Sequence, residues 1–147
     1  MAAKVGCLVA CLTLLLGVAC VAPAYNESQY HSKVAATADD AVSVIETVRL
    51  AIEATSRHGL PHNPIDVAIS GQEDILGSVT GTFASVQPPD AATQQLRTEV
   101  LDLLDQASSH LEDARIAFRR DDVGAARAAI DGAEPIAKEL DDIANRY

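Results

Sequence analysis

The chain has 147 residues, and its 21 acidic side chains outnumber its 11 basic ones, which gives a formal net charge of −10. Binding of nucleic acid needs a basic stripe for the phosphates, so this balance argues against nucleic acid as a partner. The length fits one domain; alanine is the commonest residue, aromatic residues make up 3%, and Trp is absent. This composition favours closely packed helices and leaves little room for a large ligand cavity.

The N-terminus has the pattern of an export signal or a membrane anchor. Lys4 precedes a continuous apolar run from Val5 to about Ala24, and the chain then turns acidic. A positive charge followed by an apolar run is typical of a signal whose basic end stays inside the cell. About 20 apolar residues rise roughly 30 Å as a helix, enough to cross a bilayer if no cleavage occurs. We therefore assign residues 1–24 to a signal peptide or membrane anchor and residues 25–147 to a folded domain.

Within this segment, residues 17–20 (Gly-Val-Ala-Cys) resemble the lipobox of bacterial lipoproteins, in which small residues precede a Cys that becomes diacylated after cleavage. Gly17 departs from the pattern, where Leu is usual. The resemblance is confined to this segment; it implies lipidation of Cys20 and a lipid tether to the membrane, and it brings no catalytic residue with it. Cleavage after residues 22–24 (Ala-Pro-Ala) would instead release the domain, and no cleavage would leave a single-span anchor.

Four stretches of the folded domain carry apolar residues in steps of three and four, which predicts four amphipathic helices. They cover approximately residues 26–58, 64–86, 91–120 and 122–146. Alternating strand patterns are absent, and the predicted connections are short. We therefore expect an all-α fold, an antiparallel up-down-up-down four-helix bundle preceded by the N-terminal hydrophobic segment.

The ends of these helices have recognisable signals. Asn26 can cap the first helix, and residues 59–61 (Gly-Leu-Pro) are typical of its end. Asn63 followed by Pro predicts the start of the second helix, with Pro at the first helical position. Asp90 or Thr93 caps the third helix.

Residues that disfavour helix occur inside the second and fourth helices. Gly77, Gly81 and Ser85 form a line of small residues at a spacing of four, which predicts close approach to another helix of the bundle. Pro135 should kink the fourth helix near Asp131, whose carbonyl loses its partner. Because the apolar seam stays in phase past the proline, we expect one kinked helix rather than two.

The predicted topology places the start of the first helix and Tyr147 at the end nearest the membrane. We expect Tyr25 and Tyr30 at the membrane interface, where amphipathic rings are favoured. The opposite, distal end brings the turn after the first helix close to residues 119–122.

This distal end is the best candidate for a metal site, because His58, His62, Asp121 and Asp122 offer mixed nitrogen and oxygen ligands from two turns. The arginines nearby would repel a cation, and capping explains acidic residues at a helix start equally well. His110, beside the seam of the third helix, is expected to be a boundary histidine with a structural hydrogen bond.

Motifs for catalysis are absent from the sequence. No His has Glu three residues before it, as a di-iron bundle requires, and neither His-Glu-x-x-His nor Cys-x-x-Cys-His occurs. There is no nucleophile elbow and no phosphate-binding loop. The three cysteines, Cys7, Cys11 and Cys20, all lie in the N-terminal segment, so the folded domain has no thiol chemistry. We expect no enzyme activity and no cofactor.

We therefore expect a non-enzymatic, envelope-tethered helical-bundle protein with a protein-interaction or structural role outside the cytoplasmic membrane. Val44, Ile136 and Ile143 fall beside the seams and mark either a partner interface or a wider core stripe. The alternative is a metal- or small-ligand-binding bundle, a sensor or carrier, that uses the His and Asp residues of the distal end.

Overall fold

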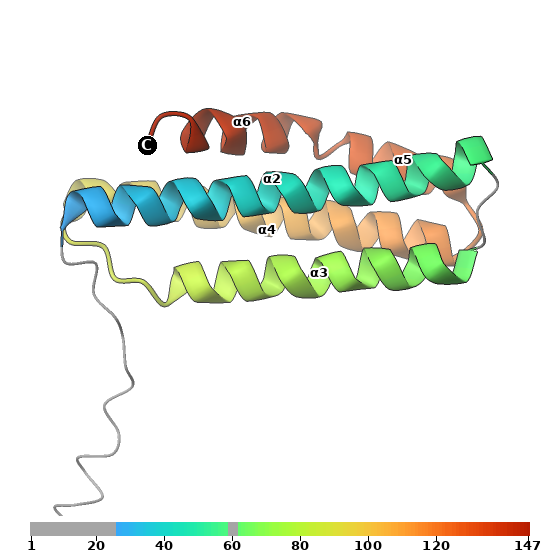
Figure 1. Ribbon diagram of the computed structural model, residues 1–147, viewed down its shortest axis with the longest axis horizontal. Helices are drawn as coiled ribbons and strands as arrows, with labels where there is room; N and C mark the ends of the chain where they lie inside the picture. Colours follow the sequence, from blue (N-terminus) through green and yellow to red (C-terminus); the bar gives the residue numbers. More distant parts are fainter. Residues whose placement is uncertain (1–25, 59–61) are drawn as a thin grey trace, which may run out of the picture.

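The chain folds into helices connected by short turns, as seen in a computed structural model (Figure 1). It describes residues 26–58 and 62–147, apart from the side chains of His58 and His62. The elements of this part are α2 (Glu27–His58), α3 (His62–Ala84), α4 (Ala91–Arg119), α5 (Val123–Asp131) and α6 (Glu134–Ala144), and no strand occurs among them. The prediction of an all-helical bundle is confirmed. The predicted signal segment, with Cys20 and Tyr25, lies outside the described residues.

Helices α2 and α4 form the centre of the bundle. They contact each other, and each also contacts α3 on one side and α5 and α6 on the other. In Figure 1 the successive long helices run in opposite directions, and α5 and α6 together make the fourth passage. The start of α2 and the end of α6 therefore lie at the same end of the molecule.

Small side chains occur on the buried faces of both central helices. Ala38 and Ala41 on α2, and Ala107 and Ala114 on α4, are fully buried. Alanine takes little space between packed helices, and larger side chains fill the rest of the core. The largest fully buried side chains include Tyr30, Phe83, Phe118, Ile45, Ile52, Ile69, Leu76, Leu104, Leu111, Ile130, Leu140 and Ile143.

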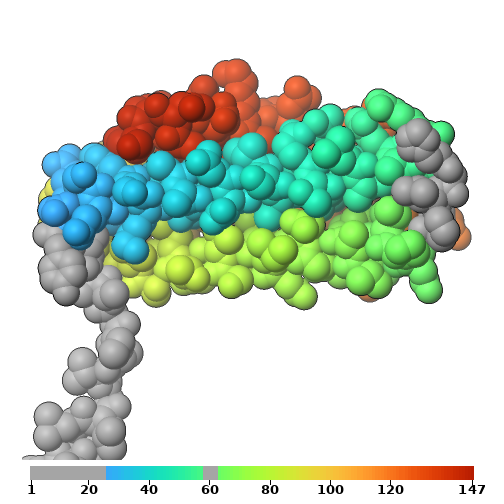
Figure 2. Space-filling model, in the orientation of Figure 1, coloured from blue at the N-terminus to red at the C-terminus, as the bar shows by residue number. Residues whose placement is uncertain are grey.

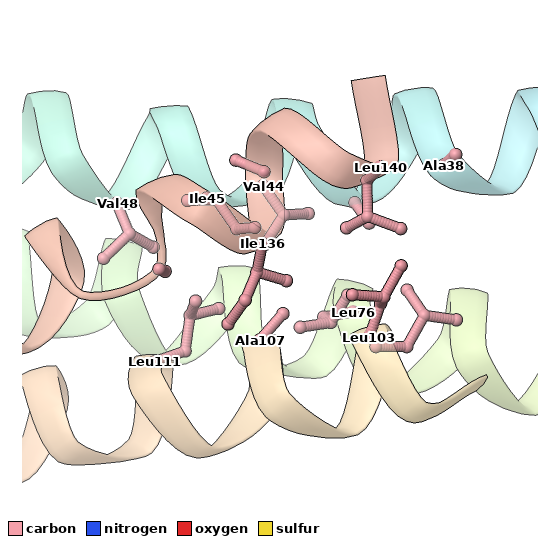
Figure 3. Packing of buried hydrophobic residues seen from close by; sticks show 14 of the residues in the cluster. Ala38, Val44, Ile45, Val48, Leu76, Leu103, Ala107, Leu111, Ile136 and Leu140 are labelled. Carbon is pink, nitrogen blue, oxygen red and sulfur yellow. The ribbon is translucent and has the colours of Figure 1, made fainter. Parts of the chain in front are cut away.

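The three apolar residues considered for a partner interface belong to this core. Val44 is 3% exposed, Ile136 7% and Ile143 1%. In Figure 3 the side chains of Val44 and Ile136 lie among core residues from the neighbouring helices. Of the two alternatives for these positions, the wider core stripe is therefore the correct one.

The fourth passage consists of two helices, not the single kinked helix predicted for residues 122–146. Pro135 has no N–H, so the carbonyl of Asp131 cannot receive the usual helical hydrogen bond. The N–H of Ala133 donates to the carbonyl of Ile130 at 3.0 Å, one residue closer than in an α-helix. The chain makes a turn at residues 132–133, and α6 begins with Pro135 in its first turn. The local hydrogen bonds, rather than the apolar phase, decide this boundary.

His110 on α4 supports the break from outside. Its Nδ1 lies 3.0 Å from the carbonyl oxygen of Ala129, which the turn has left without its helical donor. Because a carbonyl can only accept, Nδ1 carries the proton. The imidazole also covers Gly132: a Cβ at that position would lie 2.8 Å from Cε1 of His110. The prediction of a structural boundary histidine is confirmed.

Polar side chains cap three of the helices. The N–H of Gln29 donates to Oδ1 of Asn26 at 2.9 Å, as predicted. Asp90 and Thr93 cap α4 reciprocally: the N–H of Thr93 donates to Oδ1 of Asp90 at 2.8 Å, and the N–H of Asp90 donates to Oγ1 of Thr93 at 3.2 Å. Asp122 accepts from the N–H of Ala125 and caps α5.

Helix α3 differs from its prediction in two respects. It begins at His62, so Pro64 is its third residue rather than its first, a position where the missing N–H still costs no intrahelical bond. Its glycines do not serve close packing: a Cβ added at Gly71, Gly77 or Gly81 would meet nothing within 4 Å. The predicted contact through Gly77 and Gly81 is therefore wrong, because both positions lie on the outer face of the helix.

We expect Gly77→Ala and Gly81→Ala each to raise the free energy of unfolding by about 0.5–1 kcal/mol, because alanine restricts the unfolded chain and fits the open space. Urea denaturation followed by circular dichroism measures this change. Gly132→Ala is the contrasting variant: its Cβ would displace His110, and we expect a loss of about 1 kcal/mol or more. Destabilisation by Gly77→Ala would mean that another surface packs closely on α3.

The cap of α4 should make stability depend on pH. Hydrogen bonds from the backbone N–H and the hydroxyl of Thr93 lower the pKa of Asp90 below its ordinary value. A lowered folded-state pKa stabilises the protein above the unfolded pKa of about 4, and this contribution is lost as the pH falls through the folded value. We expect Asp90→Ala to lower the urea midpoint at neutral pH, with the difference from wild type shrinking in acid.

The matched variant is Asp90→Asn, which keeps a good cap without a titrating group. Its midpoint should stay close to that of wild type at neutral pH and fall less steeply in acid. Equal acid sensitivity in all three proteins would exclude Asp90 as a source of the pH dependence.

Candidate functional site

The distal end holds the residues predicted to bind a metal ion, and those described there have structural roles. Asp122 caps α5, and Asp121, with a φ of 60°, takes the left-handed conformation in the turn after α4. The side chains of His58 and His62 lie outside the described part of the chain. No group of three or more His, Cys, Asp or Glu side chains that could hold a metal ion is found among the described residues. The metal site therefore stays a prediction.

Two of the arginines at this end, Arg57 and Arg119, form ion pairs. Nε of Arg119 lies 2.8 Å from Oδ1 of Asp66, which joins α4 to α3 and raises the pKa of Arg119. On α2, Arg57 contacts Glu53 at 3.2 Å. Exposed pairs of this kind contribute little to stability.

The opposite end buries a tyrosine that was expected at the membrane interface. Tyr30 is fully buried and packs against Phe83, with ring centroids 6.1 Å apart. Its position four residues before Val34 continues the apolar seam of α2, so the ring belongs to the core. The interface prediction is therefore wrong for Tyr30.

The buried hydroxyl of Tyr30 has no hydrogen-bond partner among the described residues. Burial raises its pKa, and the positive charge of Arg97 partly offsets this effect. The guanidinium of Arg97 is held by the end of α3, where Nη2 donates to the carbonyl of Ala84 at 2.6 Å. The buried hydroxyl of Tyr30 thus lies in the field of the half-buried Arg97, without a direct hydrogen bond between them.

The start and end of the described bundle meet through two rings. The centroid of His31 lies 4.3 Å from that of Tyr147, and Nε2 of His31 is 3.8 Å from Oε1 of Glu27. The placement of Tyr147 beside the start of α2 is therefore confirmed.

The hydroxyls and the imidazole near the middle of α4 do not form a catalytic group. Oγ of Ser108 donates to the carbonyl of Leu104 at 2.9 Å, and Oγ of Ser109 donates to that of Asp105 at 3.2 Å. The imidazole of His110 is engaged by Ala129, as described above. Each of the three side chains is thus turned to a backbone carbonyl rather than to another side chain.

The largest depression described on the surface lies between α2 and α6 and has a volume of about 610 Å³. We call it the α2–α6 groove. In Figure 2 the surface of α6 adjoins that of α2 along one long side of the molecule. The groove is lined by Val42, Glu46, Asp131, Glu134, Pro135, Ala137, Lys138 and Asp141.

The groove was not predicted, although the sequence contains a periodic pattern of charged residues along one of its sides. Residues 131, 134, 138 and 141 recur in steps of three and four, which places them on one face of the last passage. All four are charged and exposed. A charged stripe of this kind is usually only a solvated face, and its neighbour on α2 could not be known before the fold.

Several of the charges in the groove have partners within the chain. Glu46 pairs with Arg49, whose pKa is raised chiefly by this hydrogen bond and further by the charges of Glu53 and Glu134. Asp131 lies 3.6 Å from Arg127. The groove is therefore acidic, with part of its charge neutralised at the rim.

None of the helices among the described residues combines the length and the apolar character that a membrane span requires. Comparison of the chain with family models, curated proteins and solved structures finds no match. The proposals for function therefore depend on the residues themselves.

We expect Tyr30→Phe to leave the free energy of unfolding unchanged or to raise it by about 1 kcal/mol, because it removes a buried hydroxyl without a partner and keeps the ring. Urea unfolding at neutral pH measures the change. Tyr30→Ala is the control and should lose about 3–5 kcal/mol through the cavity beside Phe83. A loss of more than about 1 kcal/mol in the Phe variant would show that the hydroxyl binds a partner such as an ordered water.

Proposed function

We propose that this chain is a non-enzymatic protein of the cell envelope that presents a helical surface to another protein. In this proposal an antiparallel up-down-up-down bundle follows an N-terminal signal, and the domain is tethered to the outer face of the cytoplasmic membrane. The observation that carries the interaction role is the α2–α6 groove, where charged side chains surround an apolar floor on the outside of a filled core. The alternative role, metal or small-ligand binding at the distal end, has no supporting cluster among the described residues.

The tether is supported by the sequence of residues 17–20 and by the apolar run before it. Helix α2 begins shortly after this segment in the sequence, and Tyr147 lies beside His31 near the start of α2. A tether at this end would leave the long sides of the bundle, including the α2–α6 groove, accessible from the surrounding space. Such an arrangement suits a partner that approaches the bundle from the side.

The tether is tested by expressing the full chain in a bacterium that processes lipoproteins, beside a Cys20→Ala variant. Intact mass and membrane fractionation are measured for both. We expect a mature chain that begins at a lipidated Cys20 and is found in membranes, and loss of the lipid from the variant. This outcome follows because diacylation requires the thiol of that residue.

Two other outcomes would contradict the lipid tether. A chain that begins at Tyr25 and is found in the medium would make this a secreted domain, with no membrane attachment. Retention of residues 1–24 in both proteins would indicate a single-span anchor, in which Cys20 has no role. Each outcome gives a different mass, so the three forms are distinguished in one experiment.

A further inference from the structure

The α2–α6 groove is much larger than the other depressions described on the surface. Its volume is about 610 Å³, against about 380 Å³ for the next largest, which lies between α4 and α6. Three further depressions measure about 260, 200 and 140 Å³. The volume of the α2–α6 groove lies well within the range of about 300–1,000 Å³ that ligand pockets span, and it is the largest of the five.

The groove also differs in charge. Four carboxylates line it against a single ammonium, that of Lys138, which leaves an excess of three negative charges. In the four smaller depressions the acidic residues exceed the basic ones by one at most. Two of these are bridged by ion pairs of the chain itself: Arg115 with Glu73 at 2.6 Å, and Arg119 with Asp66. The general acidity of the protein therefore does not explain the excess negative charge of the groove, because the other depressions are nearly neutral.

The cations of the chain leave part of this charge uncompensated. Nζ of Lys138 lies 3.2 Å from Oδ2 of Asp142, which is not part of the groove lining. The positive charge of Lys138 is therefore shared between the carboxylates of the groove and Asp142. Glu46 and Asp131 are paired with arginines at the rim. Within the described residues, the carboxylates of Glu134 and Asp141 form no ion pair, although the charge of Glu134 also acts on Arg49.

The floor of the groove is apolar. Val42 is half-buried and packs against the core, Ala137 is buried, and Pro135 is exposed at the break between α5 and α6. A floor of this kind below a ring of carboxylates matches the side chains of Lys and Arg, which place aliphatic stems on apolar surface and keep the charged head in water. A metal ion would gain nothing from the floor, and the described residues hold no metal-binding cluster.

We propose that the α2–α6 groove binds a basic, extended segment of a partner polypeptide. Its Lys or Arg heads contact Glu134 and Asp141, and its aliphatic stems lie on Val42 and Pro135. This inference rests on the proposed interaction function and names the chemistry of the partner. Electrostatic complementarity of this kind contributes to the association rate and to the choice of partner more than to raw affinity.

The first test is a fluorescence-anisotropy titration of the full chain, purified in a mild non-ionic detergent, with a labelled decapeptide of alternating lysine and leucine. Low salt is used because screening weakens contacts between exposed charges. The groove variant is Glu134→Gln with Asp141→Asn, and its helical circular dichroism spectrum is checked first. The matched control is Asp102→Asn with Asp113→Asn, which removes two exposed charges from α4 outside the described depressions.

We expect the groove variant to weaken binding by about tenfold, equivalent to about 1.4 kcal/mol, and the control by about twofold or less. A decapeptide of alternating glutamate and leucine should not bind. Equal weakening in the two variants would show attraction to the acidic surface as a whole and would overturn the proposal. Failure of the lysine–leucine peptide to bind the wild-type chain would also overturn it.

A second arm separates this inference from the proposed function. Single cysteines carrying a photo-crosslinker are placed at Glu134 in the groove and at Asp113 on the outer face of α4, in the membrane-bound protein. Crosslinks to a protein from Asp113 alone would support an interaction role and overturn the groove as its site. Absence of crosslinks from both positions, with peptide binding also absent, would contradict both proposals.

Discussion

The direct contact between α2 and α4 is the constraint on which the other helices depend. Both helices bury small side chains, among them Ala41 and Ala107, beside larger aliphatic ones. Helix α3 and the α5–α6 passage must then lie on opposite flanks, where each buries one apolar face against both central helices. A bundle built this way fills its interior with aliphatic side chains, so specific recognition is confined to the outside, where charge and shape vary.

The break between α5 and α6 shows how a local interruption of a helix changes the shape of the surface. Pro135 prevents a continuous helix, and the turn exposes a carbonyl that the helix would otherwise have used. His110 satisfies this carbonyl from α4, so the break is a defined element and not a frayed one. The α2–α6 groove lies beside this break, with Pro135 in its lining. The same residue that interrupts the helix therefore provides part of the apolar floor of the groove, beside Val42 and Ala137.

Periodicity predicted the helices and most of the core because it depends on residues a few positions apart. The seam from Val34 to Ile52 is buried as expected, and Asn26 and Asp90 cap their helices. The same rule could have placed Tyr30 in the core, since it lies one step before the seam. An amphipathic ring suits both the core and a membrane interface, and the predicted membrane segment directed the interpretation to the second.

The remaining differences arise from contacts distant in sequence. The apolar phase is the same on both sides of Pro135, so it does not distinguish a kink from a break. The break is made by the hydrogen bond from Ala133 to Ile130 and is supported by His110, 19 residues before Ala129. The glycines of α3 lie off its seam, yet a line of small residues suggests close packing until the neighbours of the helix are known. For the α2–α6 groove, the acidic stripe was visible in the sequence, but its apolar floor required α2 and α6 to be placed together. The distal prediction could not be decided, because two of its four side chains are not described.

The burial of Tyr30 has a consequence for spectroscopy. The chain has no Trp and three Tyr, of which Tyr147 is 43% exposed at the surface. An aromatic ring gives near-ultraviolet circular dichroism when fixed packing makes its surroundings asymmetric, and this signal disappears when tertiary packing is lost while helices persist. Among the described tyrosines, Tyr30 is the fully buried one, next to Phe83, whereas the ring of Tyr147 contacts His31 at the surface. A chain that is helical but loosely packed at this end would therefore show a weakened near-ultraviolet circular dichroism signal from Tyr30.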